Sequence, residues 1–209
     1  MLRILSLKQG VTLVELIVVM SVIGIIALFG APEIMRFVSD YKARSCATDL
    51  IQNMRIAKSM ALKENRQYLI TFDTPGKKYR IGFDGNGDGD LLDTGVDGFG
   101  TGPPVGPMRV VDFQSQYGGT VDYGTLAPAG SLPGDTCTNG KVCFGTTNNQ
   151  YITFNRNGSI AETGSVYIMH NLRGFSYCVD ILNVSGSMNM WKWNGDEDNT
   201  TETTWTELR

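Results

Sequence analysis

The sequence predicts an α+β fold in which one long N-terminal α-helix, membrane-spanning in its first half, packs on a globular domain of antiparallel β-sheet. Three observations support this prediction. An apolar run covers residues 11–31, a stripe of apolar residues at three- and four-residue steps continues to Lys63, and short runs with a two-residue period follow from Gln67. The 209 residues are enough for one sizeable core and a membrane anchor.

The apolar run is interrupted by one charge, Glu15. As an α-helix, residues 11–31 would be about 31 Å long, which is enough to span a bilayer. A carboxylate in hydrocarbon costs about 3 kcal/mol on insertion scales, so Glu15 indicates a function. The alternative is an ordinary signal anchor in which Glu15 lies in the headgroup layer.

The pattern at residues 32–65 predicts that the membrane-spanning helix continues as an amphipathic helix. One helix is thus expected over about 11–63. Polar and charged residues lie between the members of its apolar stripe, which we expect to face the globular domain. The stripe lacks regular heptads, and this disfavours a coiled coil. Its members are Val38, Tyr41, Cys46, Ala47, Leu50, Met54, Ala57 and Ala61.

Residues 66–209 predict a β-rich domain. The first two expected strands, 67–72 and 78–83, flank the sequence TPGK at residues 74–77, which is typical of a hairpin turn. The tail after Asn194 is polar and acidic, and we expect it to be partly mobile. Further strands are expected at 108–113, 150–154, 165–169, 175–184 and 187–193.

The four cysteines, Cys46, Cys137, Cys143 and Cys178, lack the C-x-x-C spacing of common zinc sites. An even number fits disulfides in an oxidising compartment. Cys137 and Cys143 flank the turn signal Asn-Gly, which favours a local disulfide between them. For Cys46 and Cys178 two interpretations stay open: a disulfide that ties the helix to a strand, or two small buried thiols.

The sequence DGNGDGD at residues 84–90 resembles the first half of an EF-hand calcium loop. Oxygen ligands at alternate positions can surround a hard cation. The twelfth position is Gly95 instead of a bidentate glutamate, so Asp93 or Asp97 would have to substitute. The alternative is a solvated turn rich in aspartate and glycine. The predicted ligands of weak calcium binding are Asp84, Asn86, Asp88 and Asp93.

The composition disfavours two classes of function, an enzyme and a nucleic-acid binder. His170 is the single histidine, and neither a nucleophile motif nor a phosphate-binding loop is present, which disfavours an enzyme. The net charge of −3 disfavours a nucleic-acid partner, because phosphate binding depends on clustered Lys and Arg. No cofactor is required apart from the calcium ion considered above.

The string GVTLVELI at residues 10–17 resembles the processing site of type IV prepilins and pseudopilins. The resemblance implies a leader peptide at 1–10, cleavage by a prepilin peptidase after Gly10, and N-methylation of Val11, where most members have phenylalanine. It also implies that Glu15 meets the free amine of a neighbouring subunit during filament assembly, which makes a buried carboxylate tolerable. Pro32 matches a proline of the family's membrane helix, where it can kink the helix.

Three further strings resemble the GspH/FimT branch of pseudopilins and minor pilins. They are IQNMRIAKSMALKENRQYLITFD at 51–73, ITFNRNGSI at 152–160 and LNVSGSMNM at 182–190. In the DNA-uptake members of the branch, the last glycine is followed by a Gly-Arg-x-Arg pattern. Here Gly186 is followed by Ser187, Met188 and Asn189, which disfavours DNA capture.

The resemblance implies a minor pseudopilin of a type II secretion system, a structural subunit that helps to initiate or cap a periplasmic pseudopilus for protein export. A minor pilin of a type IV pilus, which primes fibres for adhesion or motility, is the alternative, and the same anchor fits both. The implied partners are other pilin or pseudopilin subunits, the prepilin peptidase, the inner-membrane assembly platform and the lipid bilayer.

The expected location is the bacterial inner membrane, crossed once, with the globular domain in the periplasm and, after assembly, in a periplasmic or cell-surface filament. Arg3 and Lys8 precede the span, while Arg36, Lys42 and Arg44 follow it, so the positive-inside rule does not decide the orientation. The cysteines and the predicted calcium loop favour an outward-facing domain.

Overall fold

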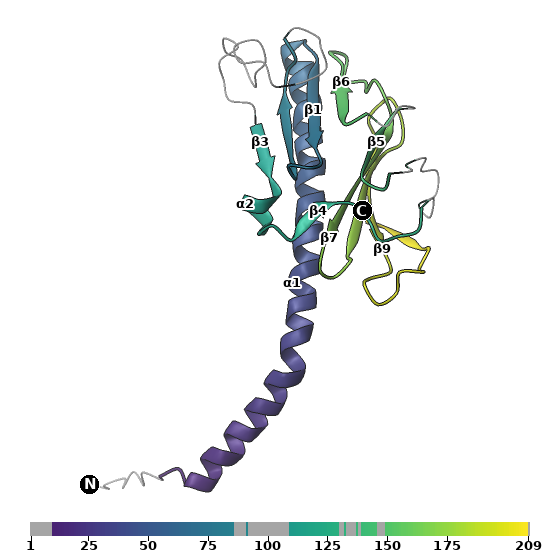
Figure 1. Ribbon diagram of the computed structural model, residues 1–209. Coiled ribbons are helices and arrows are strands. Elements are labelled where there is room, and N and C mark those ends of the chain that lie inside the picture. Colours follow the sequence, from purple (N-terminus) through teal and green to yellow (C-terminus); the bar gives the residue numbers. More distant parts are fainter. Residues whose placement is uncertain are drawn as a thin grey trace, which may run out of the picture. The chain divides into compact units, whose positions relative to one another are not determined.

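The computed structural model describes residues 10–85, 91, 109–129, 132, 137, 139–145 and 149–208 (Figure 1). The chain divides into two compact units, one up to Val38 and one from Ser39 onward. The first unit contains the N-terminal part of helix α1 (Leu13–Glu64), and the second contains the rest of α1 with all the described strands.

Helix α1 has 52 residues, so the prediction of one continuous N-terminal helix is confirmed. Its buried face begins at Ser39 and contains the predicted stripe from Cys46 to Ala61. Val38 and Tyr41 were assigned to this stripe wrongly, because they are 42% and 63% exposed and precede the packed part of the helix or face away from it. A polar residue that the periodicity did not predict, Asn53, is buried in the same face.

Four antiparallel strands form the first sheet, in the order β3-β2-β1-β6. Strands β1 and β2 form the predicted hairpin, in which Asp73 pairs with Lys78 and the Asp73 carboxylate accepts a 2.8 Å hydrogen bond from the Gly76 N–H. The strand bounds are Tyr68–Asp73 for β1, Lys78–Gly82 for β2, Arg109–Asp112 for β3 and Tyr151–Phe154 for β6.

The second sheet has the order β10-β9-β8-β7-β4, and β5 also pairs with β7. Every pairing is antiparallel, so the predicted sheet type is confirmed, although two sheets are present and the prediction named one. The strand bounds are Val121–Tyr123 for β4, Val142–Phe144 for β5, Gly164–His170 for β7, Ser176–Ile181 for β8, Met188–Trp193 for β9 and Trp205–Leu208 for β10.

The chain leaves β3 through a short helix, α2 (Phe113–Tyr117), which the sequence did not predict. The Asp112 carboxylate caps this helix by accepting hydrogen bonds from the N–H groups of Gln114 and Ser115 at 2.7 and 3.2 Å. Gly118 ends it in the left-handed region at φ 80°. The predicted strand at 108–113 extends one residue beyond the end of β3, because the helix cap at Asp112 follows the alternating residues directly.

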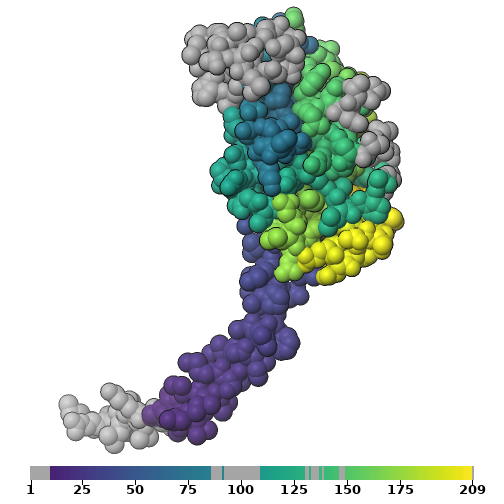
Figure 2. Space-filling model, in the orientation of Figure 1, coloured from purple at the N-terminus to yellow at the C-terminus, as the bar shows by residue number. Residues whose placement is uncertain are grey.

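The C-terminal tail ends in a strand, Trp205–Leu208, which the sequence did not predict. These residues pair with β9, and the indole of Trp193 donates a 2.8 Å hydrogen bond to the Glu202 carbonyl. Figure 2 shows the C-terminal segment, in yellow, as part of the surface of the packed domain.

Two apolar clusters lie in the second unit. The main cluster joins the buried face of α1 to both sheets, and the stacked rings of Phe72 on β1 and Phe144 on β5, 5.7 Å apart, link one sheet to the other. A smaller cluster contains Tyr167 and Cys178, with Trp191 and Trp205 packed against it. Since Cys178 alternates along β8 with residues of the main cluster, the small cluster occupies the opposite face of the second sheet.

Candidate functional site

The predicted processing site lies immediately before α1. Gly10 is exposed, and among the described residues no atom apart from those of its chain neighbours lies within 4 Å of the position where a Cβ would be. Thr12 begins the helix: its carbonyl accepts from the Leu16 N–H at 3.1 Å, and its hydroxyl accepts from the Glu15 N–H at 3.2 Å. The bond between Gly10 and Val11 therefore precedes the first helical turn.

Glu15 is exposed in the first turn of α1. The spacing Thr-x-x-Glu from Thr12 is that of a capping box, and a carboxylate is favourable at the positive end of a helix. Glu15 therefore lies where a carboxylate stabilises the start of a helix. Its role toward the amine of a neighbouring subunit stays a prediction.

The first half of α1 presents a largely apolar surface, which the exposed Glu15 interrupts. One described helix is long and apolar enough to cross a membrane, and it is α1. The side chains of this half are exposed, for example Leu13 at 75% and Phe29 at 72%. Pro32 lies inside the helix, where its missing N–H leaves the Leu28 carbonyl without its helical donor.

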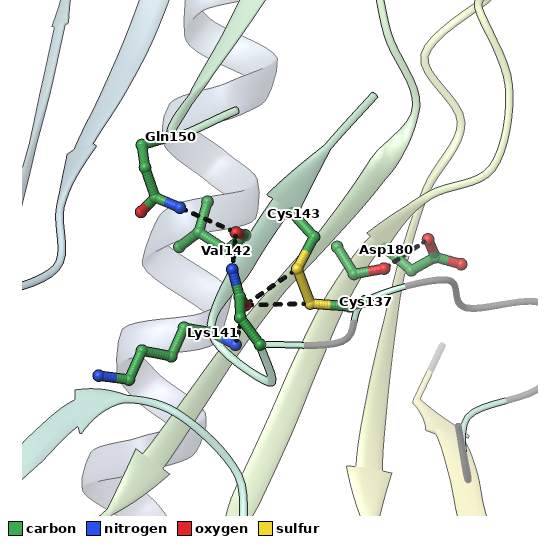
Figure 3. Close-up of a disulfide and its surroundings, with 8 residues drawn as sticks. Cys137, Lys141, Val142, Cys143, Gln150 and Asp180 are labelled. Carbon is green, nitrogen blue, oxygen red and sulfur yellow. Dashed lines mark hydrogen bonds between the residues drawn. A yellow bond between two sulfur atoms is a disulfide. The ribbon is translucent and has the colours of Figure 1, made fainter. Parts of the chain in front are cut away.

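Cys137 and Cys143 form a disulfide, with their Cα atoms 5.4 Å apart (Figure 3). Asn139 shapes the loop between them, because its side-chain oxygen accepts from the Lys141 N–H at 2.8 Å and its amide donates to the Val142 carbonyl at 3.1 Å. The local bridge suggested by the Asn-Gly turn is thus present in the structure.

The proposed disulfide between Cys46 and Cys178 is not formed. Cys46 belongs to the main cluster between α1 and the sheets, whereas Cys178 belongs to the small cluster on the opposite face of the second sheet. The period-two alternation of β8 separates them, since Tyr177 and Val179 take the face toward α1. Burial raises the pKa of the Cys46 thiol well above its ordinary value, as expected of a small core residue.

The predicted calcium ligands are largely outside the described residues. Asp84 is half-buried directly after the first hairpin, and Asn86, Asp88 and Asp93 fall in undescribed segments. In the part of the chain that the structure describes, no group of three or more His, Cys, Asp or Glu side chains could hold a metal ion. Calcium binding by this loop stays a prediction.

Polar contacts that the sequence did not predict fasten α1 to the sheets. Asp40 accepts from the Tyr177 hydroxyl at 2.6 Å and from the Lys192 ammonium at 2.9 Å. Burial, with the neighbouring Asp40 carboxylate, raises the pKa of Tyr177. Toward the first sheet, the Asn53 amide contacts the Tyr79 hydroxyl at 2.7 Å. These pairs join residues distant in sequence, so no local signal could have revealed them.

Two family models match this chain. The family model for type II transport protein GspH matches residues 47–186, and the prokaryotic N-terminal methylation motif matches residues 5–31. The chain resembles the minor pseudopilin EpsH from the type 2 secretion system of Vibrio cholerae at 8% identity and a TM-score of 0.45, over 71% of this chain and 95% of that one. It also resembles the type IV minor pilin FimU of Pseudomonas aeruginosa strain PAO1 at 17% identity and a TM-score of 0.45, over 71% and 88%. A comparison with curated proteins gave no match.

A methylation motif that leads into an exposed apolar helix, continued by an antiparallel β domain, defines a membrane-anchored subunit of the pilin and pseudopilin class. Within that class the chain belongs to the type II transport protein GspH family, whose model covers most of α1's buried face and the strands through β8. Members of this family are structural subunits, and the family implies assembly with other pilin-type subunits and processing by a prepilin peptidase.

Proposed function

We propose that the protein is a minor pseudopilin of a type II secretion system, which helps to initiate or cap a periplasmic pseudopilus that acts in protein export. The observation that carries the proposal is the match of residues 47–186 to the GspH family, joined to the methylation motif at residues 5–31. The absence of the Gly-Arg-x-Arg pattern after Gly186 supports export over DNA capture.

The function follows from the two halves of α1. The exposed apolar side chains of the first half hold the chain in the inner membrane before assembly, because their transfer into lipid removes apolar surface from water. After cleavage behind Gly10 and methylation of Val11, the same surface packs against the helices of neighbouring subunits on the assembly platform. Glu15 then meets a neighbour's terminal amine, and the domain from Ser39 onward stays in the periplasm.

Mass spectrometry of the mature N-terminus, in cells with and without the prepilin peptidase, tests the proposal. We expect a chain that begins at N-methylated Val11, and its loss when the peptidase is removed. The substitution Gly10→Val is the control: we expect it to prevent cleavage in cells that contain the peptidase. A chain that keeps Met1, or that is cut elsewhere, would contradict the proposal.

A minor pilin of a type IV pilus is the second candidate, favoured by the same methylation motif, which fits both machines. Deletion of the gene separates the two candidates. Loss of protein export with normal fibres and motility supports the pseudopilin, whereas loss of surface fibres with normal export supports the pilin.

A further inference from the structure

An open groove runs between α1 and the edge of the second sheet. It consists of two neighbouring hollows of about 480 and 350 Å³ that share Arg55 and Met188. One wall is the face of α1 from Arg44 to Leu62, and the opposite wall is the start of β9 and the end of β10 at Leu208. All these residues belong to the unit that begins at Ser39.

The groove carries an excess of positive charge. Arg44, Arg55 and Lys58 line it against a single carboxylate, that of Glu207. The Lys58 ammonium donates to the Ser185 carbonyl at 2.6 Å. Arg44 and Arg55 are exposed, and within the described part of the chain neither guanidinium forms an ion pair or a hydrogen bond. Eleven residues separate them on the helix, which corresponds to about 16 Å along the groove.

The floor of the groove is apolar. Met188, Met190 and Leu208 are partly buried and pack against the main cluster, so their outer surfaces face the groove. Methionine side chains adapt to irregular partners. A ligand of this groove therefore needs apolar side chains as well as negative charge.

The first residue of β9, Met188, lies in the groove. The Ser187 carbonyl accepts from the Leu182 N–H, so the backbone groups of Ser187 point toward β8, and those of the next residue, Met188, point away from it. Strand β10 covers β9 only as far as Met190, which pairs with Leu208. In the described part of the chain, no strand pairs with the backbone N–H and C=O of Met188.

We propose that this groove binds an extended acidic segment of a neighbouring pilin-type subunit, which lies along the start of β9 and places its carboxylates beside Arg44 and Arg55. An extended segment rises about 3.3 Å per residue and its side chains alternate between two faces, so carboxylates about four or six residues apart, on one face, would reach both guanidinium groups. Contact with the apolar floor supplies affinity, because it removes apolar surface from water, and the charges select the partner.

The inference rests on the proposed function, which brings α1 next to other subunits in every assembled filament. Because α1 is one wall of the groove, a segment that packs beside the helix at Gln52 and Arg55 also contacts the start of β9 on the other wall. In a filament a neighbouring subunit lies beside α1, and for this reason we favour it over an exported protein as the partner.

Photo-crosslinking in the native cells tests the proposal. A benzoylphenylalanine at Gln52, which lines the groove, is compared with one at Gln116, an exposed residue of α2 outside it. We expect an adduct from position 52 in which mass spectrometry identifies a pilin-type subunit linked through an acidic segment. The adduct is expected to fall about tenfold with Arg55→Glu and to stay unchanged with Lys141→Glu, an equal charge change at an exposed loop residue. A lysine introduced in the crosslinked acidic segment is expected to restore the adduct of the Arg55→Glu variant.

The proposal is overturned if position 52 gives no more adduct than position 116, or if Arg55→Glu leaves the adduct unchanged. It is also overturned if the adduct joins the chain to an exported protein or to a second copy of itself. N-terminal processing is measured in the same cells. A normal methylated Val11 without the expected adduct rejects the groove alone, while loss of processing rejects the proposed function.

Discussion

The buried pair of Asn53 and Tyr79 offers the sharpest test of how α1 is held on the first sheet. Both residues lie in the core, with exposed fractions of 3% and 0%, and their side chains meet at 2.7 Å. Burial raises the pKa of Tyr79, so its hydroxyl stays protonated at neutral pH. Tyr79→Phe or Asn53→Ala leaves one buried polar group without its partner, which costs about 1–3 kcal/mol of the free energy of unfolding.

The two changes together remove both polar groups, so we expect the double variant to be more stable than the sum of the single effects predicts, by about 1 kcal/mol or more. The assay is denaturant unfolding of the full chain in detergent micelles, followed by tryptophan fluorescence, since all three tryptophans lie in the second sheet. Gln52→Ala, an exposed neighbour on the helix, is the control and should change the free energy by less than about 0.5 kcal/mol. If the two single effects add to within about 0.5 kcal/mol, the hydrogen bond does not couple the helix to the sheet and the reasoning is refuted.

Cys137→Ser with Cys143→Ser opens a short loop, and we expect a loss of about 2 kcal/mol in the same unfolding assay; an unchanged midpoint would show that the loop is held without the bridge. Burial, helped by nearby cations, lowers the pKa of His170, so the folded state favours the neutral imidazole. We therefore expect the free energy of unfolding to be highest above the ordinary histidine pKa of about 6.5 and to fall as the pH drops below that value. Unfolding midpoints from pH 8 to pH 5 measure this, and His170→Gln should make the midpoint less dependent on pH. Glu15→Leu should leave N-terminal cleavage intact and reduce incorporation into filaments at least about tenfold, which sheared-filament blots measure; normal incorporation would assign Glu15 to the helix start alone. Calcium at millimolar concentration should raise the melting temperature, and Asp84→Ala should abolish the rise; no shift in the unchanged protein would reject the site.

The helix and most strands could be predicted because their signals are local. The apolar run and the three- and four-residue steps define α1 to within two residues at its start and one at its end. The hairpin at residues 74–77 follows from Pro and Gly between two alternating runs. Strands β4 and β5, with three residues each, are too short to show a period, and β10 is polar on its exposed side. Their strand conformation comes from pairing with β7 and β9, which depends on the tertiary fold.

The same distinction explains the two outcomes for the cysteines. Cys137 and Cys143 are close in sequence around a turn, so local chemistry was sufficient to suggest their disulfide. For Cys46 and Cys178, the question was which face of β8 is turned toward α1, and a strand buried on both faces gives no sequence signal for that choice. Every residue of β8 is buried, because α1 covers one face and the small cluster covers the other. The two faces of β8 therefore need separate apolar partners. Residues on one face pack against α1 in the main cluster, and Cys178 on the other face packs in the small cluster, which contains the disulfide-bonded Cys137 and Cys143.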